Sequence, residues 1–116
     1  MPKDKLFLLV LIVILSSSYL TMLISTSFFK QVSKSEVDSA INQARLVYSV
    51  KLKSGEDMEL GPCLSDALMT NWVLDIVHNP RQEVDDLEEN QCPSFVQGRR
   101  LHLVELDKEG NLIRTR

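Results

Sequence analysis

Cysteine is scarce in this sequence of 116 residues, where it occurs only as Cys63 and Cys92. Their spacing is not Cys-x-x-Cys, which excludes a thioredoxin-like redox motif, and a four-ligand zinc site would need both His78 and His102 as well. Two cysteines in a small domain are typical of a disulfide formed in an oxidising compartment. The pair therefore favours a structural disulfide over a redox or metal centre.

Glycine and positive charge are scarce as well. The four glycines do not form a Gly-rich phosphate loop, and no serine or cysteine lies in a recognisable nucleophile motif. Residues 1–30 carry three Lys against one Asp, a balance of +2, whereas residues 31–116 carry 10 basic and 15 acidic residues, a balance of −5. Binding to phosphate backbones needs clusters of Lys and Arg. We expect no nucleic acid partner, no catalytic residues, no metal and no cofactor.

Charge is absent altogether from Leu6 to Phe29. A helix over this run would be roughly 36 Å long, enough for a hydrocarbon core of about 30 Å. The run predicts an N-terminal membrane anchor, residues 1–30, that crosses the membrane once. Lysines flank it on both sides and leave its orientation open, but the expected disulfide places the C-terminal domain outside the cytoplasm. The alternative is a signal peptide cleaved near Ser18, which would make the protein secreted.

An amphipathic helix is expected within residues 31–55. Val37, Ile41, Ala44 and Tyr48 recur at helical spacing, and Ser33 with Glu36 forms a capping-box pattern. These features predict a helix from about 34 to 53. Whether it continues the membrane helix as one rod is left open by the sequence.

Residues 56–116 predict a small, disulfide-bonded, β-rich domain. A strand is expected over 72–78 and a helical turn over 65–70, with a single helix over 65–78 as the alternative. A solvated and mobile acidic loop is expected over 81–90, and a hairpin that turns at Gly110. Trp72, Leu74 and Ile76 would face the amphipathic helix, and Asp75 would lie on the opposite side. The expected fold class is α+β: a transmembrane helix, an amphipathic helix and a three-stranded antiparallel sheet with one disulfide.

A candidate interaction site follows from the polar residues at the end of this strand. It comprises Trp72, Asp75, His78, Asn79 and Arg81. Asp75 and His78 would project from opposite faces of the strand, so a catalytic pair is not expected. The alternative hypothesis is a small metal-binding or enzymatic accessory domain that uses His78, Asp75 and the acidic loop.

Four stretches, "GPCLS", "WVLDIVHNPRQ", "VDDLEENQC" and "HLVELDKEGNLI", resemble a family of short, uncharacterised bacterial proteins with one N-terminal membrane segment. The resemblance covers roughly residues 60–113 and implies no particular activity. The expected architecture is also similar to type IV pilins and pseudopilins, although the Gly and Glu that mark processed pilins are missing.

The sequence thus predicts a non-enzymatic, single-pass membrane protein of the cell envelope. Its domain would bind another envelope protein, or copies of itself in a pilin-like manner.

Overall fold

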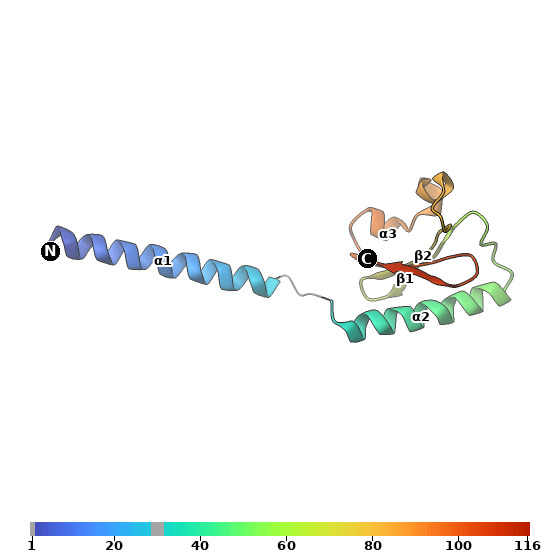
Figure 1. The fold of residues 1–116 in the computed structure, drawn as a ribbon, viewed down its shortest axis with the longest axis horizontal. Coiled ribbons are helices and arrows are strands. Elements are labelled where there is room, and N and C mark those ends of the chain that lie inside the picture. Colours follow the sequence, from blue (N-terminus) through green and yellow to red (C-terminus); the bar gives the residue numbers. More distant parts are fainter. Residues whose placement is uncertain (1, 29–31) are drawn as a thin grey trace. The chain divides into compact units, whose positions relative to one another are not determined.

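The computed structural model describes residues 2–28 and 32–116. The chain divides into two compact units, residues 1–32 and 33–116 (Figure 1). The expected anchor boundary at residue 30, and the continuity of the two helices, lie outside the described residues.

The first unit is helix α1, Lys3–Phe28. Its stretch Lys3–Leu23 is long and apolar enough to cross a membrane, and none of that stretch is buried within the chain. Apolar side chains such as Phe7 and Leu15 are therefore exposed. A helix that is apolar on every side needs an apolar environment outside the chain.

The second unit begins with helix α2, Lys34–Lys53, as expected. The Ser33 side chain caps its start by accepting a hydrogen bond from the backbone N–H of Glu36. The Glu36 side chain does not complete the predicted capping box. Instead, its Oε1 accepts a hydrogen bond of 2.9 Å from Nε1 of Trp72, which ties the first turn of the helix to the sheet.

The sheet has four strands, in the order β1-β2-β3-β4. They are β1 Cys63–Met69, β2 Trp72–Ile76, β3 His102–Leu106 and β4 Leu112–Thr115. β2 and β3 are parallel, whereas both outer pairs are antiparallel. The predicted three-stranded antiparallel sheet is therefore wrong in strand number and direction, although the α+β class is confirmed.

The additional strand, β1, occupies the segment for which a helical turn was expected. A tight turn through Asn71, whose φ is 68°, reverses the chain and pairs Met69 with Trp72. Asn tolerates this left-handed conformation better than most residues. The apolar residues Leu64 and Leu68 are buried along β1, where they contribute to the core.

The sheet is covered on both faces (Figure 1). Helix α2 packs on β1 and β3 from one side, and the short helix α3, Pro93–Val96, lies on the other side with the 3-10 turns η1, Glu83–Asp86, and η2, Glu88–Asn90. Every residue of β2 is buried as a result. Burial on both faces is the usual environment of parallel strands.

The predicted hairpin is confirmed between β3 and β4. The Asp107 carboxylate accepts hydrogen bonds from the backbone N–H groups of Glu109 and Asn111, and Gly110 has a φ of 88°. The Tyr48 hydroxyl on α2 donates a hydrogen bond of 2.7 Å to the carbonyl of Lys108. The turn is thereby attached to the helix.

Replacing Gly61 by Ala is expected to cost about 2 kcal/mol more of the free energy of unfolding than replacing Gly55, because of overpacking. Both glycines have positive φ, so both changes strain the backbone. A Cβ at Gly61 would lie 2.5 Å from Asp85 Oδ1 and 2.9 Å from the Ile76 carbonyl oxygen, whereas a Cβ at Gly55 meets nothing. Urea unfolding followed by Trp72 fluorescence measures the difference; equal losses would contradict the close approach.

Candidate functional site

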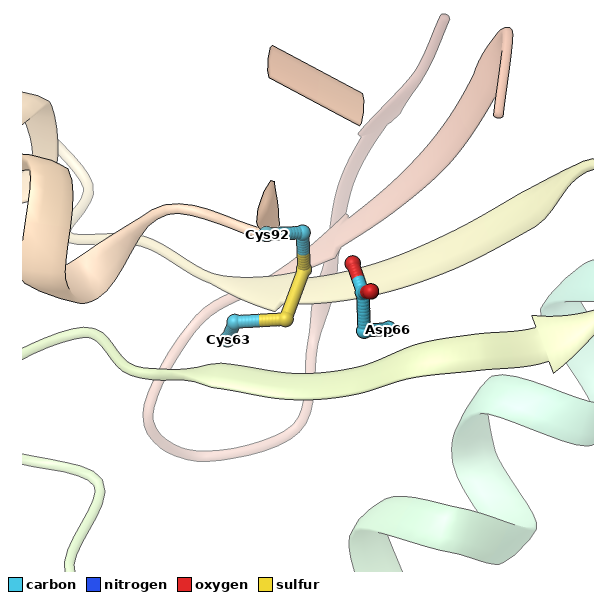
Figure 2. Close-up of side chains that lie close together, drawn as sticks. All are labelled: Cys63, Asp66 and Cys92. Carbon is cyan, nitrogen blue, oxygen red and sulfur yellow. A yellow bond between two sulfur atoms is a disulfide. The ribbon is translucent and has the colours of Figure 1, made fainter. Parts of the chain in front are cut away.

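The two cysteines form a disulfide that links β1 to the start of α3. Figure 2 shows Asp66 beside it. These three residues are the only group of potential metal ligands that converges within the described residues. The sulfur atoms are bonded to each other, and the Asp66 carboxylate accepts hydrogen bonds from the backbone N–H and the hydroxyl of Ser94. The arrangement is therefore a structural disulfide, and the neighbouring Asp66 carboxylate fixes α3 through Ser94.

The disulfide is part of a small apolar core on the face of the sheet opposite α2. Val73 of β2, Leu103 of β3 and Cys92 are buried together, and Cys63 and Phe95 pack against them. This core closes one end of a cleft between the sheet and α3.

The cleft has a volume of about 330 Å³. Its lining divides into an apolar part at the disulfide core and a polar part at the ends of the parallel strands. The complete lining is Val73, Asp75, Arg81, Asp86, Gln91, Cys92, Phe95, Val96, Leu103, Glu105 and Arg116. An apolar concavity with a few convergent polar groups is the usual form of a binding site.

The polar part is built by the parallel register, which places Asp75 directly beside Glu105. Glu105 is neutralised from two sides, at 2.6 Å by Nε of Arg114 and at 3.4 Å by a guanidinium nitrogen of Arg81. Arg81 also bonds Asp86 at 2.8 Å on the surface. The guanidinium groups of Arg81 and Arg114 are therefore bonded to Glu105 and Asp86, and neither donates a hydrogen bond to Asp75.

Asp75 is the exception in this network. It is 8% exposed, and its Oδ1 is buried with no hydrogen-bond partner among the described residues. Burial, followed by the adjacent Glu105, raises the pKa of the carboxyl group to about 8 against the opposing effect of Arg81. A buried polar atom without a partner is uncommon and costly.

His78 does not approach Asp75. Its Nδ1 lies 2.8 Å from Asp85 Oδ1, and its Nε2 lies 2.9 Å from the carbonyl oxygen of Glu59. Both ring nitrogens face acceptors, and only the doubly protonated ring can donate to both. The geometry gives His78 a role in holding the loop.

The acidic loop folds into the turns η1 and η2, and one of its five carboxylates, Asp85, is buried rather than solvated as expected, whereas the other four are exposed. Asp85 is 1% exposed and accepts hydrogen bonds from the backbone N–H groups of His78 and Gln82. Burial raises the pKa of its carboxyl group, but the hydrogen bonds from Gln82 and His78 outweigh burial and lower the pKa below its ordinary value. Asn90 is buried too, and donates to the carbonyl of Val84.

Replacing Asp85 by Asn is expected to lower the free energy of unfolding at neutral pH by about 2 to 4 kcal/mol, because it removes a buried charge with several donors. The exposed Asp86, changed to Asn, serves as the control and should cost less than about 1 kcal/mol. The Asp85 contribution is present above about pH 4 and lost as the pH falls through its lower folded-state pKa. Urea unfolding at several pH values tests both points, and equal losses for the two variants would contradict the buried role.

The predicted interaction residues are divided between the two faces of the sheet. Asp75 and Arg81 line the cleft, and His78 and Asn79 lie beyond it near the loop. Trp72 lies on the face of α2, where it contacts His102 with ring centroids 5.0 Å apart. The structure thus brings two of the five residues together with others that sequence reasoning missed: Glu105, Phe95, Val96 and Arg116.

The missed residues lie on α3, on β3 and at the C-terminal end of the described chain. These segments come close to Asp75 only because β2 and β3 pair in parallel. The sequence held one signal for Glu105. It is the only charged residue within the apolar run "LVEL". Comparison of the chain with family models, with curated proteins and with solved structures finds no match. No role is therefore transferred to this chain from another protein.

Proposed function

We propose that this protein is a single-pass membrane protein whose disulfide-bonded domain lies outside the cytoplasm and acts by binding another protein of the cell envelope. The observation that carries the proposal is an exposed apolar helix followed by a domain that is closed by a disulfide. Disulfides of this kind persist in oxidising compartments. An interaction role is favoured over catalysis because both ring nitrogens of His78 are engaged in the fold.

The mass of the protein purified from native membranes tests the anchor and the compartment together. We expect an unprocessed chain that stays in the membrane after an alkaline wash and that reacts with alkylating agents only after reduction. Release by the wash, a mature chain that begins after Ser18, or free thiols at Cys63 and Cys92 would contradict the proposal.

A photoreactive amino acid at Val96 tests the interaction role. Val96 is exposed at the edge of the cleft, so a bound protein would lie within reach. We expect a cross-linked product in living cells, and its mass separates a second copy of this chain from another protein. The same probe at exposed Ser39 on α2 is the control. Equal products from both positions, or none, would contradict binding at the cleft.

A further inference from the structure

The unpartnered carboxyl group in the cleft points to a specific ligand chemistry. Asp75 is more than nine-tenths buried, lies in the wall of the cleft, and has an oxygen atom with no hydrogen-bond donor among the described residues. Its neighbour Glu105, by contrast, already receives two guanidinium groups. One carboxyl oxygen in the wall of the cleft is therefore left without a hydrogen-bond partner.

The rest of the cleft suits an aliphatic stem. Val73, Leu103 and Cys92 line its apolar part, together with Phe95 and Val96 of α3. Long basic side chains bury their methylene groups on apolar surfaces while the charged end reaches a polar partner. The combination of an apolar floor with an unpaired carboxyl group matches such a side chain.

Other ligand classes fit less well. A metal ion would need several convergent ligand atoms, and Asp75 belongs to no such group within residues 2–28 and 32–116. An anion would meet the free carboxyl group, while Arg81 is engaged by Asp86 and Glu105. Arg116, the remaining cation of the lining, lies over the Phe95 ring at 5.7 Å from its centroid.

We propose that the cleft receives a basic side chain, lysine or arginine, of the protein that this domain binds, with its cationic end at Asp75. The stem lies on Val73 and Leu103. This inference rests on the proposed interaction function and names the group that is recognised. The choice of partner rests on the Asp75 carboxyl group, which has an unpartnered oxygen and becomes complementary in charge to a cation when it gives up its proton.

Binding of a cation should be coupled to the release of a proton from Asp75. The raised pKa means that the carboxyl group of the free domain is largely protonated at neutral pH, and a cation stabilises the ionised form. The affinity should therefore rise about tenfold for each pH unit up to about pH 8 and then level off. The charged groups that face Asp75 from the surrounding elements are Glu105, Arg81, Asp85, Asp86, Arg114 and Arg116.

The test is an NMR titration of the full chain in detergent micelles with amino acids capped at both ends. Capped lysine and capped arginine are the basic probes, capped norleucine is the neutral probe and capped glutamate is the acidic probe. We expect at least one basic probe to shift the amide signals of Val73, Leu103 and Phe95, and to bind at least tenfold more tightly than norleucine. The Asp75 carboxyl carbon should report ionisation on binding.

Asp75→Asn is the decisive variant, because it keeps the shape and removes the charge. It should lower the affinity for the basic probes by at least tenfold and abolish the pH dependence of that affinity. Asp38→Asn, on the exposed side of α2, should leave the affinity and its pH dependence unchanged. Trp72 fluorescence confirms that each variant is folded.

Several outcomes would overturn the inference. They are equal binding of norleucine, preference for glutamate, affinity that falls as the pH rises, or no shift of the cleft signals with either basic probe. None of them depends on the membrane anchor, and the titration is made on the oxidised protein. Failure here is therefore distinct from failure of the proposed function, which the mass, alkylation and cross-linking measurements decide.

Discussion

The Asp75→Asn variant should be more stable than the parent protein at pH 8, by on the order of 3 to 5 kcal/mol in the free energy of unfolding. Burial and the adjacent Glu105 raise the folded-state pKa of Asp75 to about 8, whereas the unfolded chain titrates near the ordinary value of about 4. The folded domain therefore holds its proton more tightly than the unfolded chain does.

The sign of the pH dependence follows from this difference. The contribution of Asp75 to stability is fully present below about pH 4 and is lost progressively as the pH rises to about 8, at about 1.4 kcal/mol for each pH unit. Asn does not titrate, so the variant should lack this decline. The decline is the opposite of the acid-sensitive contribution of Asp85.

Urea unfolding of the full chain in detergent, followed by Trp72 fluorescence between about pH 4 and pH 9, measures the effect. Trp72 is the only tryptophan and is 1% exposed, so it reports on the core of the domain. Asp38→Asn removes a charge of the same type from an exposed position and should leave the profile unchanged. Parallel profiles for Asp75→Asn and the parent would contradict the raised pKa.

Removing the disulfide is the second large effect. Cys63 and Cys92 are separated by 29 positions, and closing a loop of this length in the unfolded chain accounts for about 3.6 kcal/mol of stability in the chain-entropy model. Cys92 is also buried with Val73 and Leu103, so its loss leaves space in the apolar core of the cleft. For a domain of this size, a loss of that magnitude is a large part of the total.

The Cys63→Ala, Cys92→Ala double variant should therefore unfold at a markedly lower urea concentration than the oxidised parent. The parent in the presence of a reducing agent should lose a similar amount, whereas the double variant should not respond to the reducing agent. A parent that keeps its midpoint after verified reduction would show that the disulfide contributes little.

Helices α1 and α2 and the hairpin could be predicted because their signals are local. The Ser33 cap, the apolar spacing of α2, and the turn at Gly110 each depend on residues within a few positions of one another. The parallel pair could not be predicted in this way, because β2 and β3 are joined by a crossover that includes η1, η2 and α3. The pairing of Asp75 with Glu105, and with it the cleft, depends on that crossover.

Alternation in β2 was informative about the direction of side chains but not about their burial. It placed Trp72 toward α2 and Asp75 on the opposite side, but it did not indicate that the opposite side is covered as well. Asp75 is buried because the disulfide and α3 cover that face. Asp85 looks like any surface carboxylate in the sequence, and its burial depends on His78 and Gln82, whose backbone N–H groups donate to it.

The two outer strands of the sheet limit how this domain can associate. β1 pairs with β2 through an irregular register, and β4 is only four residues long, with Arg114 among them. Bulges, short length and charge on edge strands are features that prevent sheets from extending into one another and aggregating. Polymerisation by adding strand to strand is therefore disfavoured, and any assembly of copies would have to use other surfaces.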